Sequence, residues 1–148
     1  MSSVFEIWEE RAKIAKISRF IGQKLEVLEE GVCKITLPYR DDFEQTFGVI
    51  HGGVITLIAD TAGYFAAATR VGEMPLATAE IKMNFVAPVY REAIYAIGRV
   101  VKAGRQIIVC ELKVYAAKTD KMVALGLASY SRINTVKKIG AQVPPATK

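Results

Sequence analysis

The chain has 148 residues, of which 51% are hydrophobic and 24% are charged. This length and balance suit one folded globular domain that needs no disulfide or metal to complete its core, and they exclude an intrinsically disordered chain. The net charge of +5 is compatible with a phosphate-bearing ligand and with ordinary solubility, but no basic run interleaved with aromatics is present, so no nucleic-acid partner is expected.

The first predicted element is an amphipathic helix. Its apolar residues recur at helical spacing, with Glu and Lys between them: Val4, Ile7, Trp8, Ala12 and Ala15. Two short strands are predicted next, over 24–28 and 32–37, with a turn at 29–31. Residues 38–48 have the composition of a loop.

A long apolar helix is predicted from about residue 52 to 69, and the Gly and Pro of 71–75 end it. Its most apolar part, 54–68, is too short and too rich in Ala, Thr and Gly to span a membrane. This part contains a single carboxylate, Asp60, which is costly to bury unless it is paired, hydrated or used chemically. Asp60 is therefore either a catalytic base or nucleophile, or a structural residue bonded to a core partner.

After residue 76 the apolar period changes to two. This pattern predicts strands over 77–86, 93–102, 106–117 and 122–133. One long helix and about six mostly antiparallel strands predict an α+β fold, in which a curved sheet wraps around the helix. Because the helix is apolar on nearly all sides, we expect it to be covered on all sides.

Residues 1–148 are interpreted as one domain, with a loose tail over 134–148. Edge strands of such a sheet invite pairing with a second copy, so a homodimer is the expected assembly. Cys33 and Cys110 each lie in an alternating apolar segment, and no secretory signal precedes them. They are interpreted as buried reduced thiols, which indicates the cytoplasm.

Several chemistries are excluded by the motifs that the chain lacks. One histidine and two distant cysteines cannot form a zinc cluster of the usual spacing, so no metal site is predicted. The chain also has no Gly-x-Ser-x-Gly elbow, no Gly-x-x-x-x-Gly-Lys loop and no Gly-x-Gly-x-x-Gly. Serine hydrolases of that type, simple ATPases and dinucleotide enzymes are thereby disfavoured.

The start of the central helix, at His51, Gly52 and Gly53, is the second candidate feature. Free amides at a helix start attract negative charge and can stabilise an oxyanion that develops at a carbonyl. A glycine pair can equally serve a tight turn. Nine residues separate His51 from Asp60, roughly 13–14 Å of rise, so Asp60 and the Gly52 amide are expected to lie far apart and on opposite faces. They then have either no joint role or a composite site between two subunits.

The combined pattern Gln45-x5-His51-Gly52-Gly53-x6-Asp60 resembles the signature of hotdog-fold acyl-CoA thioesterases, in the branch of the phenylacetate-pathway (PaaI-like) and hydroxybenzoyl-CoA thioesterases. Three later segments continue the resemblance: residues 76–88, 98–105 and 124–133. It spans roughly residues 20–133 and implies a hotdog fold, an acyl-CoA substrate, no metal or organic cofactor, and a dimer or dimer of dimers with composite active sites.

The resemblance also implies roles for single residues. Asp60 is the carboxylate that attacks the thioester or activates water, and the Gly52 N–H of the partner subunit polarises the carbonyl. Gln45 orients the carbonyl or the water, and His51 mainly holds the loop. Thr78 occupies the position of a Ser or Thr that helps to place the water, although a plain strand threonine is the alternative.

Substrate-binding residues follow from the same resemblance. The phosphates of coenzyme A need cations near the mouth of the groove, and four basic residues at strand ends and turns are candidates: Lys82, Arg91, Lys102 and Arg105. Arg105 is favoured because Gly104 exposes it on a turn. The helix start, with Gly53, is expected to line the ligand groove. Asn84, Phe85 and Val86 resemble the strand segment that lines the pantetheine tunnel, although each could equally serve packing. Tyr64, one turn after Asp60 on the same face, is placed to touch the acyl group, bond the carboxylate or fill the core.

The sequence therefore favours a cytoplasmic acyl-CoA thioesterase. One alternative is a module that binds or senses acyl-CoA on the same fold without cleaving it, although binding alone needs neither Asp60 nor Gln45. The other is a hotdog dehydratase or hydratase, whose catalytic histidine is placed differently from His51. The identity of the acyl group, whether aryl, medium-chain or long-chain, stays open.

Overall fold

The computed structural model describes residues 3–72 and 75–133. Its helices are α1 (Val4–Ile14), α2 (Lys16–Ile21) and α3 (Gly52–Val71), with a short 3-10 helix at Asp41–Phe43. Its strands are β1 (Lys24–Glu29), β2 (Val32–Leu37), β3 (Leu76–Phe85), β4 (Ile94–Ala103), β5 (Ile107–Ala116) and β6 (Met122–Arg132). The tail predicted over 134–148 lies outside the described residues.

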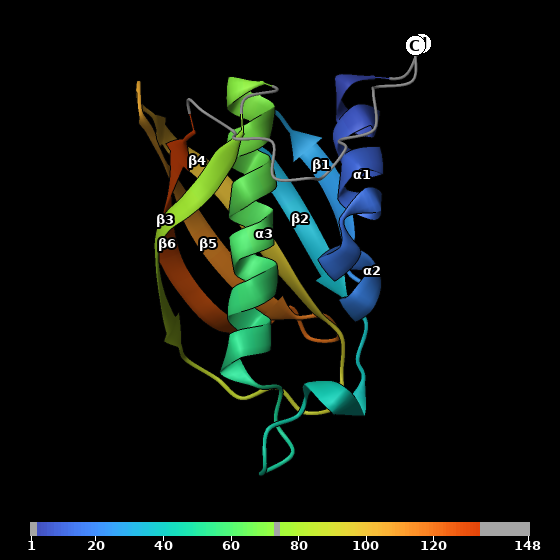
Figure 1. The fold of residues 1–148 in the computed structure, drawn as a ribbon. Helices are drawn as coiled ribbons and strands as arrows, with labels where there is room; N and C mark the ends of the chain where they lie inside the picture. The colour runs from blue at the N-terminus through green and yellow to red at the C-terminus, as the bar shows by residue number, and fades with distance from the viewer. Residues whose placement is uncertain (1–2, 73–74, 134–148) are drawn as a thin grey trace.

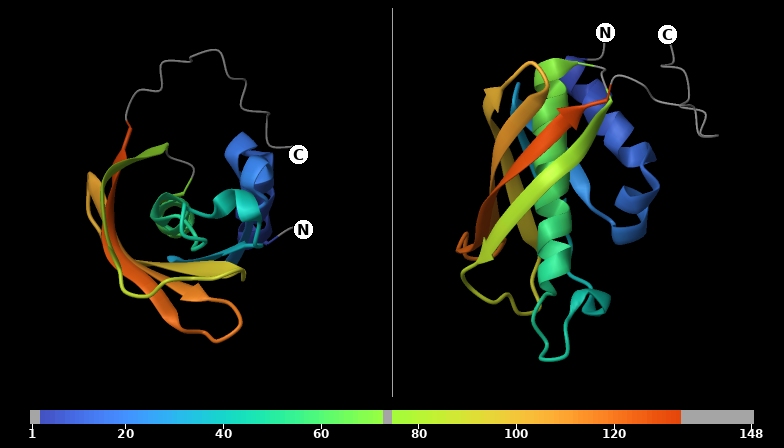
Figure 2. Two further views of the ribbon diagram at one scale, coloured as in Figure 1. Left: turned by 90° about the horizontal axis from the view of Figure 1, so that it is seen from below. Right: turned by 60° about the vertical axis from the view of Figure 1, so that its left-hand side comes forward.

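The six strands form one antiparallel sheet in the order β1-β2-β4-β5-β6-β3. The sheet curves around α3, which runs along its concave side, while α1 and α2 lie on the flank of α3 (Figures 1 and 2). The α+β fold and the wrapped helix were predicted and are confirmed. All six strands lie within one or two residues of their predicted bounds, because alternating burial leaves a clear period of two in the sequence.

The N-terminal segment differs from the prediction of one amphipathic helix. It is broken at Ala15, whose extended backbone (φ −60°, ψ 123°) ends α1 and begins α2. Trp8 and Ala12 are buried as predicted, whereas Val4 and Ile7 are 65% and 41% exposed. The helical spacing of apolar residues correctly indicated a helix. However, α1 lies at the edge of the fold, and only a narrow stripe of its surface packs on the core. An alanine carries no sequence signal for an extended conformation.

Helix α3 approaches the sheet closely because small residues face each other there. A Cβ added to Gly98 of β4 would lie 2.4 Å from the carbonyl carbon of Ala62 and 2.5 Å from the Gly63 nitrogen. Backbone atoms cannot move aside as a flexible side chain can. The glycine therefore sets the distance between helix and sheet.

We expect Gly98→Ala to lower the free energy of unfolding by about 3 kcal/mol, because the added methyl group overpacks a backbone contact. Urea denaturation measures the change. Gly52→Ala is the matched control: its Cβ meets only the ring of Phe85, at 3.4 Å. An unchanged stability of Gly98→Ala would contradict the close approach of α3 to β4.

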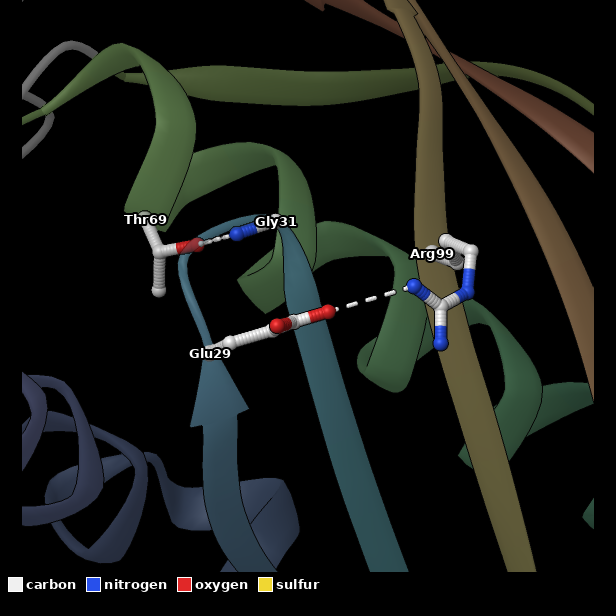
Figure 3. A network of polar contacts seen from close by, with 4 residues as sticks. All are labelled: Glu29, Gly31, Thr69 and Arg99. Atoms are coloured by element: carbon white, nitrogen blue, oxygen red, sulfur yellow. Dashed lines mark hydrogen bonds and ion pairs between the residues drawn. The ribbon is translucent and has the colours of Figure 1, made fainter.

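The C-terminal end of α3 is tied to the turn between β1 and β2 (Figure 3). The Gly31 N–H donates to Thr69 Oγ1 at 2.8 Å, and Gly31 has a φ of 80°, which favours glycine. Beside this turn, Arg99 pairs with Glu29 at 3.2 Å. The far end of the helix is thus anchored, which helps to hold the middle of α3 in place along the sheet.

The expectation that α3 is covered on all sides is wrong for the single chain. Ile58, Ala59 and Ala62 are fully buried, but a second face of the helix, which includes Leu57 and Asp60, is only half-buried. The sheet and α1 cover most of the circumference and leave this face partly open. Asp60 is therefore a partly hydrated carboxylate and not a buried charge.

Both cysteines are buried and free, as predicted. Burial raises the pKa of the Cys33 thiol to about 12 and that of the Cys110 thiol to about 12, so both stay protonated at neutral pH. Across residues 3–72 and 75–133, no helix has the length and apolar character needed to cross a membrane.

Candidate active site

The start of α3 is shaped by the side chain that precedes it. His51 is the N-cap residue, and its Nδ1 accepts a hydrogen bond of 2.8 Å from the Gly53 N–H. The backbone N–H of His51 donates to Phe43 O at 2.8 Å, which fixes the loop before the helix. Within the described residues, no hydrogen bond uses the Gly52 N–H. His51 thus holds the helix start and leaves a free amide beside it.

Gln45 lies in a tight turn against this helix start. Its backbone N–H donates to Val49 O at 2.8 Å, and Gly48, with a φ of 80°, donates back to Gln45 O at 2.9 Å. The Gln45 side-chain oxygen accepts from the Phe47 N–H within the same turn. Gln45 and Gly52 line one pocket of about 350 Å³, together with Phe85, Val86 and neighbouring apolar residues.

Asp60 lies further along α3 and faces the first part of β3. The Thr78 hydroxyl donates to Asp60 Oδ1 at 2.9 Å. The pairing of β3 with β6 is irregular between Thr78 and Glu80, and such a bulge redirects a strand and its side chains. Asp60, Thr78 and Tyr64 line a second pocket, of about 210 Å³. The sequence named all three residues, and the structure brings them together.

Tyr130 is a neighbour of this group that the sequence did not indicate. Its hydroxyl donates to the backbone oxygen of Asp60 at 2.8 Å. Burial, and then the nearby Asp60, raise the pKa of the Tyr130 hydroxyl far above its usual value. A Cβ on Gly63 would lie 2.3 Å from the Tyr130 oxygen, so this glycine makes room for it. In the sequence, Tyr130 looks like any other apolar residue of an alternating strand. The only hint at this contact is Gly63, three residues after Asp60.

The two pockets are separated along α3, and neither contains both Gly52 and Asp60. The separation along the axis was predicted, but the prediction of opposite faces was wrong. The nine-residue count runs from His51, which precedes the helix, whereas Gly52 is the first helical residue. The eight steps from Gly52 to Asp60 give roughly 12 Å of rise and a rotation of about 80°.

The four predicted phosphate-binding residues do not converge in the single chain. Arg91 precedes β4, is exposed and pairs with Glu44 at 3.6 Å. Lys102 and Arg105 are exposed beside the hairpin at the far end of β4. Lys82 is exposed on β3, the edge strand of the sheet, which also presents Asn84. None of these five residues lines either pocket.

The chemistry of the site is that of a carboxylate and helix-start amides. In the part of the chain that the structure describes, no group of three or more His, Cys, Asp or Glu side chains could hold a metal ion. A half-buried carboxylate with a hydroxyl donor can take a proton from water or attack a carbonyl. A free amide at a helix start can polarise a carbonyl oxygen.

The chain is also similar in sequence to known proteins of one family. Residues 47–123 match the model of the thioesterase superfamily. A protein of Saccharolobus solfataricus, provisionally named an esterase, is 32% identical over 123 residues, which are 83% of this chain and 87% of that protein. A second protein of the same organism, with the same kind of name, is 31% identical over 81% of this chain and 79% of its own length.

Solved structures share the fold. A thioesterase from Haemophilus influenzae superposes with a TM-score of 0.80 at 22% identity, covering 94% of this chain and 96% of that one. The PaaI protein of the phenylacetic acid degradation operon of Escherichia coli gives a TM-score of 0.80 at 19% identity, covering 90% and 99%. At these identities the likeness establishes the hotdog architecture and leaves the substrate open.

Proposed function

The chain belongs to the thioesterase superfamily, and from that premise we propose that it hydrolyses an acyl-CoA to the free acid and coenzyme A. One observation carries the proposal: the Asp60 carboxylate lines a pocket and accepts a hydrogen bond of 2.9 Å from Thr78. A carboxylate so placed suits the hydrolysis of a reactive ester, and the reaction requires no metal or organic cofactor.

Asp60 has two possible roles in this reaction. As a general base it takes a proton from water while the water oxygen bonds to the thioester carbon; the C–S bond then breaks, and the thiolate takes up a proton. As a nucleophile it displaces the thiolate itself and forms a mixed anhydride, which water then hydrolyses. Thr78 supports either role, because its hydroxyl orients one carboxylate oxygen.

The other half of the proposed site comes from a second copy of the chain. In this arrangement two α3 helices run antiparallel, so the Gly52 N–H and Gln45 of one subunit meet Asp60 of the other. The separation of the two pockets supports it, as does the half-buried face of α3 around Asp60. Strand β3 adds support, because its ten residues form an edge that is mostly exposed. The assembly is proposed to be a homodimer, alone or paired into a tetramer.

Coenzyme A is proposed to bind across the same dimer, and its phosphates to contact some of the exposed cations Lys82, Arg91, Lys102 and Arg105. A cytoplasmic location is proposed from the two free, buried thiols.

A panel of acyl-CoAs with aryl, medium-chain and long-chain acyl groups tests the proposal. Release of the free thiol is followed with a thiol reagent, and binding is followed in parallel by calorimetry. Cleavage of at least one acyl-CoA is expected. Tight binding without any thiol release would favour the acyl-CoA-binding module instead, and hydration of crotonyl-CoA would favour a hydratase.

Thr78→Val is expected to lower kcat on the cleaved acyl-CoA by about tenfold, because it removes a hydrogen bond to a charged oxygen while preserving the shape of the side chain. Thr78→Ser keeps the hydroxyl and should retain most of the activity. Initial rates at saturating substrate measure the effect. If Thr78→Val keeps the wild-type rate while Thr78→Ser loses it, the packing of the methyl group matters and the hydrogen bond does not.

A further inference from the structure

The net positive charge of this protein is concentrated in one short segment. Residues 11–24 contain five Lys or Arg and no Asp or Glu, so this segment accounts for the whole net charge of +5, and the rest of the chain is neutral overall. The segment comprises the end of α1 and all of α2. Such an asymmetry creates a local field that attracts an anionic partner.

Within this segment, exposed cations alternate with exposed apolar side chains. Three pairs follow one another at a spacing of three residues: Lys13 and Ile14, Lys16 and Ile17, and Arg19 and Phe20. All six side chains are exposed, Phe20 by as much as 72%. Ile17 and Phe20 lie about one turn apart on one side of α2, whereas Ser18 and Ile21 are buried. Helix α2 therefore carries apolar residues on the side that faces solvent, where a surface helix ordinarily carries polar ones.

The cations of this surface are available to a partner. Lys13 pairs with Glu10 at 2.5 Å, but across residues 3–72 and 75–133 no ion pair engages Lys16 or Arg19. The backbone of Phe20 is held in place, because Arg40 Nη1 donates to its oxygen at 3.0 Å. Both helices lie on the outer flank of the molecule, and β3 lies on the other side of α3 (Figures 1 and 2).

A bilayer surface with anionic headgroups matches this chemistry. The apolar side chains of an interfacial helix enter the boundary between headgroups and acyl chains, while Lys and Arg beside them contact the lipid phosphates. A second copy of the chain is a poor occupant, because the cations of one copy would face those of the other. A partner that offers only negative charge would leave the exposed apolar side chains in water.

We propose that this face docks the protein peripherally on anionic lipid bilayers. Ile14, Ile17 and Phe20 insert between the headgroups, and Lys16 and Arg19 contact the phosphates. Ile17 also lines the pocket beside Asp60, so a docked bilayer lies next to that pocket. The proposal does not depend on the proposed thioesterase function, because binding to a bilayer requires no turnover.

Cosedimentation of the full-length protein with lipid vesicles tests the proposal. The partition coefficient should be about tenfold higher on phosphatidylcholine mixed with phosphatidylglycerol than on phosphatidylcholine alone, and should fall as salt is added. Lys16→Gln combined with Arg19→Gln should lower binding to the mixed vesicles by about tenfold. Lys118→Gln combined with Lys121→Gln is the matched control, because it removes the same charge from exposed lysines between β5 and β6. The control should bind nearly as well as the wild-type protein.

A second variant tests the insertion of apolar side chains. Phe20→Ser should lower binding to the mixed vesicles by about tenfold, because the ring no longer leaves water on docking. Phe47→Ser, the same substitution at a phenylalanine that is 86% exposed in another loop, should bind as the wild-type protein does. Thermal melting confirms that each variant is folded.

Three results would overturn the proposal. The first is equal partition of the wild-type protein onto neutral and anionic vesicles. The second is an equal loss of binding in the two variants with paired substitutions of cations, which would show that only the net charge matters. The third is unchanged binding of Phe20→Ser, which would show a purely ionic contact of the kind that an acidic protein could also make.

Discussion

Replacing Asp60 with Asn is expected to lower kcat on the cleaved acyl-CoA by about a thousandfold while the fold stays intact. The amide has nearly the shape of the carboxylate, and its oxygen can still accept the hydrogen bond that Thr78 donates. It can neither take a proton from water nor attack a carbonyl. The loss should therefore lie in kcat, with KM little changed, since the remainder of the pocket is untouched.

The chain offers a matched control for this substitution. Asp120 also accepts a hydrogen bond from a hydroxyl, that of Tyr95, at 2.8 Å, but it lies in the turn between β5 and β6. Its φ of 55° suits asparagine equally well. Asp120→Asn should leave kcat unchanged. Retention of more than a tenth of the wild-type kcat by Asp60→Asn would remove Asp60 from the chemistry.

A single turnover in isotopically labelled water separates the two roles of Asp60. If Asp60 is the nucleophile, the label enters its side-chain carboxylate when water opens the anhydride, and mass spectrometry of the peptide detects it. If Asp60 is the base, the label appears only in the released acid.

Replacing Gly52 with Pro is expected to lower kcat by about a hundredfold or more, because it removes the amide that is proposed to polarise the carbonyl. The substitution is structurally mild. Gly52 is the first residue of α3, where proline is well tolerated, and the backbone of His51 before it (φ −61°, ψ 134°) already has the extended conformation that a following proline requires. Gly52→Ala keeps the N–H and should retain most of the activity.

Mixing the two inactive variants tests whether each site is shared by two subunits. In a hybrid dimer of Asp60→Asn and Gly52→Pro chains, one site carries both substitutions and the other carries neither. Unfolding and refolding an equal mixture should therefore restore about a quarter of the wild-type activity, because half of the dimers are hybrids with one intact site each. Separately refolded variants are the control. No recovery despite hybrid formation would argue against a composite site.

The sequence determined the architecture because each helix or strand is indicated by the spacing of apolar residues within its own segment. Alternation with a period of two located all six strands within one or two residues. One long apolar run located α3, since a helix that packs against a curved sheet must be apolar over most of its surface. The same periodicity did not reveal the break at Ala15, because one residue in an extended conformation leaves no pattern.

In the candidate site, too, the sequence indicated some features, and others came only from the structure. Asp60, Gly52 and Gln45 could be named from their spacing and family resemblance, because these residues lie close together in the chain. The contact of Thr78 with Asp60 joins a helix to a strand 18 residues later, beside an irregularity in the pairing of β3 with β6. The prediction of opposite faces for Gly52 and Asp60 was wrong because it used the nine-residue offset from His51, whereas the eight steps from Gly52, the first helical residue, rotate by only about 80°.

Two features were beyond reach from the sequence. Tyr130 reaches the backbone of Asp60 across 70 positions, through the space left by Gly63. Gln23 gives no signal in the sequence; in the structure it lines the Asp60 pocket beside α2, and its amide oxygen has no hydrogen-bond partner among the described residues. Local periodicity therefore determined the elements of this protein and the position of its carboxylate in them. Only the tertiary structure decided which distant side chains surround that carboxylate, because hydrogen-bond partners depend on the three-dimensional packing of segments whose order in the chain does not reveal their contacts.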